Sequence, residues 1–225
     1  MLELDSKVWE TPKIKICCVS STDEAELALH HGAHALGLVS AMPSGPGVID
    51  ESLIVRIVQQ VNGRAETFLL TAQQDADAII DQYHRCRPST MQLVDHVAPH
   101  ELRKLRHALP GVMLVQVIHV TGAESIDEAK AAASLVDAIL LDSGNQKLAV
   151  KELGGTGRTH DWTISRKIRE QCGIPLFLAG GLKPENVRDA IEQVQPFGLD
   201  LCSGVRTDSR LDESKLRAFF LAAGK

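Results

Sequence analysis

Short apolar segments alternate with amphipathic segments along the whole chain. Eight of the apolar segments have the composition of buried strands, and most are continuous runs rather than strict alternations of polar and apolar residues. Continuous runs are typical of strands that are covered on both faces, as in a parallel sheet. We therefore predict strands at residues 13–19, 35–40, 66–71, 90–95, 112–120, 138–143, 174–179 and 197–203.

A helical pattern with suitable end signals follows each predicted strand. Ser21 or Thr22 can cap the first helix, because a side-chain oxygen there accepts a hydrogen bond from an unpaired backbone N–H. Asp50 and Asp161 can cap two later helices in the same way. We expect Pro184 to open another helix, since its missing N–H needs no partner in the first turn.

The strand count and the chain length together narrow the architecture. Eight βα units in 225 residues average about 28 residues each, close to the minimum for a crossover unit. A doubly wound open sheet usually carries a GxGxxG loop after its first strand, but the sequence here is CCVSST. We predict an α/β fold with a single-domain, eight-stranded parallel (β/α)8 TIM barrel over residues 1–225, with residues 1–12 as a short N-terminal extension.

Composition indicates a globular protein and disfavours polyanionic partners. The chain is 44% hydrophobic and 24% charged, and 24 Lys and Arg against 29 Asp and Glu give a net charge of −5. With only 4% aromatic residues, it lacks both the basic surface and the stacking side chains that nucleic-acid binding uses. We expect no nucleic-acid or membrane partner, because no apolar run reaches the roughly 18–20 residues of a membrane helix.

The cysteines and the N-terminal segment indicate a reducing compartment. Residues 1–13 contain no apolar signal-peptide core. The five cysteines are odd in number and show no CxxC spacing, unlike a disulfide framework or a zinc ribbon. We therefore expect a cytoplasmic protein with reduced thiols.

Two residues that can transfer protons follow predicted strands. A side-chain period of two places Lys15 and Cys17 on one face of the first strand and the apolar residues, Cys18 among them, on the other. The same period turns Asp142 inward at the end of the sixth strand. Catalytic residues of β/α barrels lie at the C-terminal ends of strands, so Cys17 and Asp142 are candidates for acid and base. A buried core thiol and a loop-capping carboxylate are the alternative interpretation.

Glycine clusters after the last two strands indicate a phosphate site. Gly180 and Gly181 follow the seventh strand, and Ser203 and Gly204 follow the eighth. These are the loops in which β/α barrels commonly bind phosphate through backbone N–H groups. Simple tight turns would explain the same glycines. After the sixth strand, residues 151–162 form a long Gly-rich loop that we expect to act as a mobile lid.

Five motifs resemble those of the phosphoribosylanthranilate isomerase family, in order and in spacing. They are KICC (15–18), LLDS (140–143), GGTGRTHDW (154–162), LAGGLKPENV (178–187) and GLDLCSGV (198–205). The family pattern reads KICG, LLDS, GGTGKTFDW, LAGGLNPENV and GVDVSSGVE. The similarity runs over nearly the whole chain and is greatest in its last third.

This resemblance implies a cytoplasmic barrel enzyme of tryptophan biosynthesis that needs neither metal nor cofactor. Its reaction is the Amadori rearrangement of N-(5-phosphoribosyl)anthranilate to the 1-deoxyribulose phosphate product. Asp142 would be the general acid and Cys17 the base that takes the C2 proton. The substrate is a small phosphorylated sugar, and the protein is a monomer or a homodimer. The residues implied to bind substrate or phosphate are Gly155, Arg158, Asp200, Gly180, Gly181, Ser203 and Gly204, with Lys15, Gln92 and His119 as further candidates.

The sequence departs from the family pattern around the anthranilate end of the substrate. The family's SPRYV loop, whose Arg helps to hold the carboxylate, is SGPGV at 44–48, and its QLHG is QLVD at 92–95, which places a negative charge at Asp95. Lys151, Arg158 and Arg206 are candidates to replace the missing Arg. Further departures are Cys18 for Gly, His160 for Phe and Arg206 for Glu.

Two other functions therefore stay open. A paralogue could isomerise a different phosphorylated sugar or aminosugar, and a non-catalytic barrel could bind a phosphorylated metabolite. Retention of both Cys17 and Asp142 argues against the non-catalytic alternative, since binding requires neither. His119, at the end of the fifth strand, is the next candidate for the base. Cys17, Asp142, His119 and His96 lack the spacing of metal ligands, so we expect no metal site.

Overall fold

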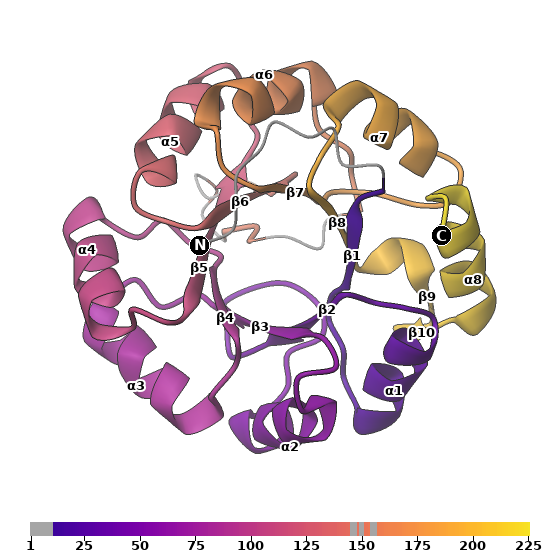
Figure 1. Ribbon diagram of the computed structural model, residues 1–225, viewed down its shortest axis with the longest axis horizontal. Coiled ribbons are helices and arrows are strands. Elements are labelled where there is room, and N and C mark those ends of the chain that lie inside the picture. The colour runs from indigo at the N-terminus through magenta and orange to yellow at the C-terminus, as the bar shows by residue number, and fades with distance from the viewer. Residues whose placement is uncertain (1–10, 145–147, 149–150, 154–156) are drawn as a thin grey trace.

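Eight parallel strands close into a barrel in the computed structural model, which describes residues 11–144, 148, 151–153 and 157–225. Each strand is hydrogen-bonded to its neighbours in chain order, and β8 returns to pair with β1 (Figure 1). The strands are β1 (Lys13–Ile16), β2 (Ala35–Val39), β3 (Glu66–Thr71), β4 (Thr90–Leu93), β5 (Met113–His119), β6 (Ala138–Asp142), β7 (Leu176–Leu178) and β8 (Gly198–Leu201). The predicted eight-stranded (β/α)8 barrel is confirmed.

Helices surround the barrel and complete each βα unit (Figure 1). They are α1 (Thr22–His30), α2 (Glu51–Val61), α3 (Ala76–Cys86), α4 (Pro99–Ala108), α5 (Glu124–Ala133), α6 (Trp162–Cys172), α7 (Val187–Val194) and α8 (Glu213–Ala222). Between β8 and α8 lie a 3-10 helix, η1 (Ser203–Val205), and a short antiparallel pair, β9 (Arg206–Thr207) with β10 (Arg210–Leu211). The N-terminal extension predicted at 1–12 lies largely in residues 1–10, outside the described residues.

The two faces of the sheet bury different sets of side chains. Outward residues such as Ile14 and Ile16 are fully buried between barrel and helices, where they form the larger apolar cluster. Inward residues form a second cluster inside the barrel. There the Phe177 ring packs edge-to-face on Phe68 and Phe197, with ring centroids 5.6 and 5.3 Å apart. Double-sided burial explains why the strands read as continuous apolar runs.

Several predicted caps are present, but the start of α7 is not where we predicted it. Ser21, Asp50 and Asp161 each accept a hydrogen bond from the first turn of the helix that follows. Pro184 does not open a helix, because α7 begins at Val187 and residues 184–186 form a turn. Asn186 holds this turn: its side chain accepts from the Lys183 N–H and donates to the Gly181 carbonyl.

Two neighbouring strands, β1 and β8, end earlier than the sequence predicts. The first strand ends at Ile16 rather than 19, and the last ends at Leu201 rather than 203. Cys18 adopts the left-handed conformation with φ of 60°, which stops extended pairing. Ser203 already belongs to the 3-10 helix η1. The polypeptide therefore turns across the barrel mouth earlier than hydrophobicity alone indicates.

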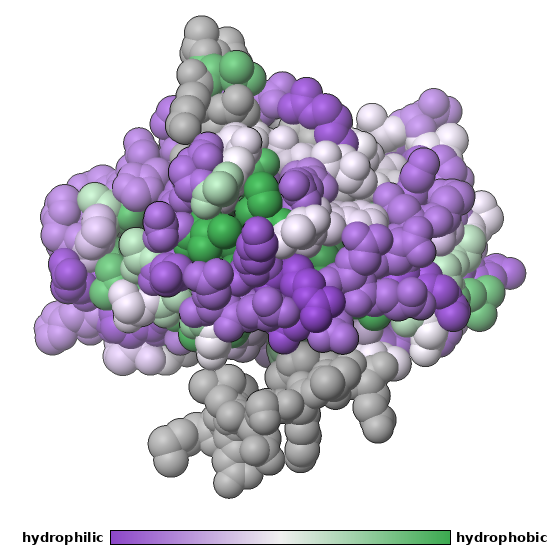
Figure 2. Space-filling view, turned by 90° about the horizontal axis from the view of Figure 1, so that it is seen from above, coloured by the Kyte–Doolittle hydropathy of each residue, from purple (hydrophilic) through white to green (hydrophobic). Residues whose placement is uncertain are grey.

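The outer surface is polar on the side that Figure 2 presents, with hydrophobic residues visible only in limited areas. None of the helices in the described part of the chain has the length and apolarity that crossing a membrane would require.

Gly198 lets the Phe177 ring lie against β8, and we predict that adding a methyl group there destabilises the barrel. A Cβ at this position would lie 2.4 Å from Cδ1 of Phe177, which is itself enclosed by other rings. Gly198→Ala should lower the free energy of unfolding by about 1–3 kcal/mol, the usual cost of overpacking, measured by urea denaturation.

Gly111→Ala is the matched control, because a Cβ at Gly111 would meet no atom within 4 Å. Equal stability losses in the two variants would show that the cost does not come from contact with Phe177.

Candidate active site

A pocket opens at the C-terminal ends of the strands, where a β/α barrel carries its chemistry. Side chains from β4, β6 and β8 reach it, together with the segments after β1, β2, β7 and β8. The pocket-lining residues that the sequence singled out are Cys17, Gln92, Asp142, Gly180, Gly181, Asp200, Ser203 and Gly204. The structure thus brings both candidate proton-transfer groups and both glycine clusters to one cavity.

Lys15 and Asp200 form a buried ion pair beneath this pocket. Lys15 lies on β1 and Asp200 on β8, directly opposite in the strand register. The Lys15 Nζ is fully buried and donates to the Asp200 carboxylate at 2.8 Å, with its charge 5.3 Å from the centre of the Phe68 ring. Burial lowers the pKa of Lys15, but attraction to Asp200 and Cys17 outweighs it and raises the pKa above its ordinary value.

The absence of a side chain at Gly37 makes room for this arrangement. A Cβ on Gly37, in β2, would lie 2.8 Å from the Cys17 Sγ and 2.9 Å from the Lys15 Nζ. Neither atom is free to retreat, since both are buried. The inward direction predicted for Lys15 and Cys17 is confirmed.

The Cys17 thiol lies where its ionised form is favoured. A hydrogen bond from Cys18 and the positive charge of Lys15 lower the pKa of Cys17, while burial and Asp200 act in the opposite direction. The net shift is downward from the ordinary value of a thiol. A thiolate is the form of cysteine that accepts a proton, so the lowered pKa makes Cys17 better suited to act as a base.

Asp142 has the opposite tendency. It lies at the last position of β6 and is buried, and burial raises the pKa of its carboxyl group above the ordinary value. The Ser143 backbone N–H donates to it at 2.7 Å and, with the charge of His119, partly opposes that shift. A carboxyl group that holds its proton more firmly is better suited to act as an acid.

His119 is held as part of the framework behind Asp142. It is the residue opposite Asp142 in the β5–β6 register, and its Nε2 donates to the Val94 carbonyl at 3.1 Å. Its Nδ1 is buried without a hydrogen-bond partner, and Gly144 packs against that atom. Since His119 does not line the pocket, its geometry favours a positioning role over that of the base.

The glycines after β7 and β8 bring backbone to the pocket wall. Gly180 and Gly181 both have positive φ, at 84° and 61°, a conformation that glycine adopts without strain. A Cβ on Gly204 would lie 2.0 Å from the Leu182 carbonyl oxygen, so the two loops pack together through bare backbone. Such a surface presents main-chain N–H groups to an anion.

The three candidate replacements for the missing Arg are all in ion pairs. Lys151 pairs with the buried Asp95, and Arg158 pairs with Glu152 at the exposed surface. Arg206 is buried against Glu24, at 2.9 Å. Among the described residues that line the pocket, none is Lys, Arg or His. Gly155 lies outside the described residues, as does part of the loop expected to act as a lid.

Two pocket-lining thiols were not among the predicted site residues. We expected Cys18 to face the helices, and this is wrong, because its left-handed backbone turns it into the pocket. Cys202 also lines the pocket, and the two sulfurs lie 2.7 Å apart. A cysteine where a family pattern has glycine is the sequence signal that indicates such a backbone.

In the described part of the chain, no three His, Cys, Asp or Glu side chains are grouped as metal ligands.

Comparison with known proteins identifies the family. The sequence model of the N-(5'-phosphoribosyl)anthranilate (PRA) isomerase family matches residues 14–222. The N-(5'-phosphoribosyl)anthranilate isomerase 2 of Methanosarcina mazei is 35% identical over 209 residues, which cover 92% of each chain. This chain belongs to the PRA isomerase family.

Solved structures of PRA isomerases have the same fold. The crystal structure of phosphoribosylanthranilate isomerase from Thermotoga maritima is 25% identical, has a TM-score of 0.81 and covers 95% of this chain and 98% of its own. A second structure, of a PRA isomerase in complex with reduced 1-(o-carboxyphenylamino)-1-deoxyribulose 5-phosphate, is 24% identical with a TM-score of 0.78. It covers 95% of this chain and 98% of its own.

For this PRA isomerase family member, we predict that the two partners of the buried ion pair shift the pKa of Cys17 in opposite directions. Lys15→Met removes the attracting cation and should raise it, whereas Asp200→Asn removes the repelling anion and should lower it. Each variant should also lose about 3–5 kcal/mol of stability, because one buried charge is left without its partner.

The rate at which iodoacetamide alkylates Cys17 is measured as a function of pH by peptide mass spectrometry. Cys172→Ser is the control variant, in which the pKa of Cys17 should not change. Shifts of the same sign in both variants would contradict an electrostatic origin.

We also predict that His160 makes the fold sensitive to acid. Burial lowers the pKa of His160 from 6.5 to about 4. The unfolded chain therefore binds a proton on this ring over a pH interval in which the folded chain does not, so stability falls as the pH falls from 6.5 towards 4. The loss reaches up to about 3 kcal/mol.

His160→Phe should flatten this part of the pH dependence in urea denaturation, whereas His107→Phe, on an exposed position of α4, should leave it unchanged. An identical pH dependence in wild type and His160→Phe would exclude His160 as the cause.

Proposed function

We propose that this protein catalyses the Amadori rearrangement of N-(5'-phosphoribosyl)anthranilate in tryptophan biosynthesis. The observation that carries the proposal is the meeting of Cys17, Asp142 and the two glycine loops in one pocket of a PRA isomerase-family barrel. The relative with the bound reduced product analogue supports the same class of ligand. A non-catalytic barrel would need neither the thiol nor the carboxyl group.

Asp142 starts the proposed reaction. Its protonated carboxyl group donates to the ribose ring oxygen, the bond from that oxygen to C1 breaks, and the amine nitrogen stabilises C1 as a Schiff base. The raised pKa of Asp142 keeps the proton available for this step. Burial away from bulk water also directs the proton to the substrate rather than to solvent.

Cys17 completes the proton transfers. Its thiolate removes the proton from C2, the resulting enolamine tautomerises, and C2 becomes the ketone while C1 gains a hydrogen. No external oxidant is required, since C2 is oxidised as C1 is reduced. Lys15 stabilises the thiolate before the transfer, and its pairing with Asp200 keeps this cation in place.

The phosphate group is proposed to lie against Gly180, Gly181, Ser203 and Gly204, all on the pocket wall. Asp200 and Gln92, which line the same cavity, are proposed to contact the ribose or the bridging amine. Gln92 has a buried carbonyl oxygen that lacks a hydrogen-bond partner, so it can accept one from the substrate.

Lys151 is our proposed partner for the anthranilate carboxylate. The Ser44 hydroxyl donates to its backbone carbonyl, so Lys151 touches the loop that carries the pocket residues Gly45 and Pro46. Its neighbour Leu153 also lines the pocket. The ammonium group would exchange Asp95 for the substrate carboxylate, or contact both.

Isomerisation of another phosphorylated sugar is the second candidate function. It is favoured by the absence of Lys, Arg and His among the described residues of the pocket wall. Under either function we propose a small phosphorylated substrate, a cytoplasmic location, and a monomer or homodimer that forms one domain.

We predict that Asp142→Asn abolishes turnover of freshly generated phosphoribosylanthranilate while largely preserving affinity for a product analogue. Cys17→Ser should lower kcat by about 10²–10⁴-fold, the typical contribution of general acid–base catalysis. The loss of substrate fluorescence measures turnover, and Cys172→Ser on α6 is the control.

Equal losses of binding and turnover in Asp142→Asn would contradict its role as the acid. A near-normal rate in Cys17→Ser would move the base to another residue. A folded wild-type protein with no turnover would favour the second candidate function.

A further inference from the structure

Cys18 and Cys202 face each other across the junction of the first and last barrel strands. Ile16 is the register partner of Leu201, and the Cys17 N–H donates to the Leu201 carbonyl at 2.7 Å. The polypeptide then leaves both strands, and the two sulfurs lie 2.7 Å apart at the pocket wall. Neighbouring parallel strands lie about 4.8 Å apart, within the range over which a disulfide can bridge two cysteines.

The backbone around Cys18 accommodates its side chain at an energetic cost. Cys18 has a positive φ, which a residue with a Cβ rarely adopts. Gly47, from the loop after β2, contacts Cys18 so closely that a Cβ there would lie 2.5 Å from the Cys18 Cβ. Strained residues of this kind cluster at sites with a function, and here the strain places a thiol in the pocket.

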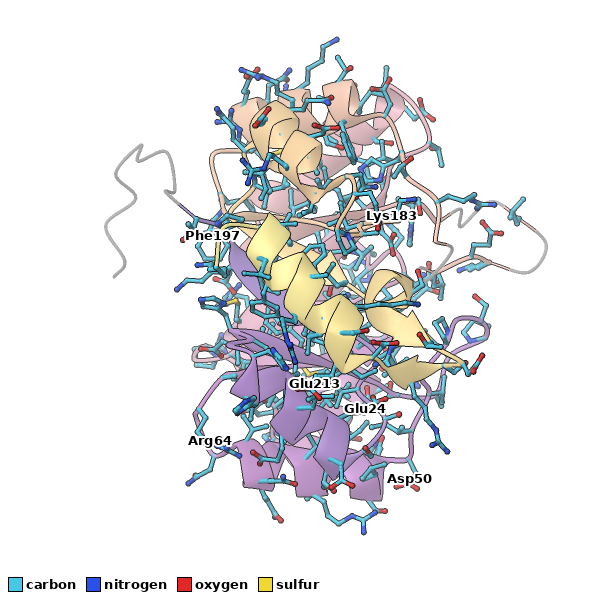
Figure 3. All side chains as sticks on the ribbon, turned by 90° about the vertical axis from the view of Figure 1, so that its right-hand side faces the viewer. Glu24, Asp50, Arg64, Lys183, Phe197 and Glu213 are labelled. Atoms are coloured by element: carbon cyan, nitrogen blue, oxygen red, sulfur yellow. The ribbon has the colours of Figure 1, made fainter. Side chains whose placement is uncertain are left out.

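Arg206 supplies positive charge beside the two thiols. Its guanidinium donates to the carbonyls of Cys17 and Cys18, at 3.1 and 2.6 Å, and is held by Glu24 of α1, which Figure 3 labels beneath α8. Hydrogen bonding with Cys17 and Cys202, together with burial, raises the pKa of Cys18 well above the ordinary value of a thiol, so Cys18 keeps its proton. Reactive thiols are characteristically partly exposed and near a cation, and Cys202 is partly exposed.

We propose that Cys18 and Cys202 form a reversible disulfide under oxidation by hydrogen peroxide, and that this bond slows the enzyme by withdrawing the Cys18 thiol from Cys17. The effect on turnover rests on the proposed function, whereas formation of the bond does not.

The chemistry balances with peroxide as the oxidant. The Cys202 thiol is oxidised to a sulfenic acid as peroxide is reduced to one water. The Cys18 thiol then attacks that sulfur, the S–S bond forms, and the hydroxyl group leaves with the Cys18 proton as a second water. Two thiols lose two electrons in total, and peroxide accepts both. A dithiol reductant reverses the process.

Formation of the disulfide removes the thiol hydrogen through which Cys18 influences Cys17. Cys18, the next residue along the chain, and the positive charge of Lys15 both lower the pKa of Cys17. A disulfide sulfur carries no hydrogen to donate, so oxidation should raise the pKa of Cys17 and reduce the thiolate fraction at neutral pH. The oxidised enzyme should then show its activity loss mainly on the acid side of the pH–rate profile.

The experiment treats the reduced full-length protein with hydrogen peroxide, blocks remaining thiols with N-ethylmaleimide, and maps tryptic peptides without reduction. Cleavage after Lys15 and Arg56 leaves Cys17 and Cys18 in one peptide, while Cys202 lies in another that ends at Arg206. We expect these two peptides to be linked in the wild type and in the control Cys172→Ser. Cys18→Gly, which relieves the positive φ, and Cys202→Ser should both lack the link.

Activity is compared between the oxidised and reduced forms of each variant. The wild type and Cys172→Ser should lose at least about tenfold at pH 7, the effect of moving the pKa of the base by one unit or more, and dithiothreitol should restore it. Cys18→Gly and Cys202→Ser should keep most of their own reduced activity.

Three outcomes would overturn the inference: no linked peptide in the wild type, a link that persists in Cys18→Gly because Cys17 is the partner, or a stoichiometric link without loss of turnover. If the reduced protein shows no isomerase activity, the proposed function fails instead, and the peptide map still decides whether the disulfide forms.

Discussion

The ion pair between Lys15 and Asp200 is the interaction on which the site depends. An ammonium group with no access to water is stable only because a carboxylate on the adjoining strand neutralises it. That same ammonium group favours the thiolate of Cys17 above it. The barrel therefore uses a costly buried charge to favour the ionised form of a thiol, and the bare backbone at Gly37 provides the space for both side chains.

Hydrophobic pattern was enough to predict the barrel and the inward direction of Cys17 and Asp142. Those features follow from periodicity over whole strands, which a sequence displays directly. The outward direction assigned to Cys18 failed because a single positive φ overrides the alternation. The pairing of Lys151 with Asp95 was also beyond prediction, since it joins two loops 56 residues apart in the chain and depends on their approach in space.

Several of the departures from the family pattern form two groups in space. Cys18, Gly47, Cys202 and Arg206 gather at the junction of β1 and β8, where each contacts another member of the group. Val94 and Asp95 lie after β4, where Val94 accepts from His119 and Asp95 pairs with Lys151. In each group, the residues that differ from the family pattern contact one another or a common neighbour. Cys17 and Asp142 keep the residue types of the family pattern, so these departures lie around the two side chains and not at them.

The junction of β1 with β8 also has a consequence for how the protein is made. Lys15 and Cys17 belong to the first βα unit of the barrel, whereas Asp200 and the second glycine loop belong to the eighth. During translation Lys15 emerges long before its carboxylate partner on β8, and burying the ammonium group without that partner would be costly. The pocket is thus completed by β8, the last of the barrel strands in chain order. A chain that terminates before β8 would retain Cys17 and Asp142 but lack Asp200, Ser203 and Gly204, which form one wall of the pocket.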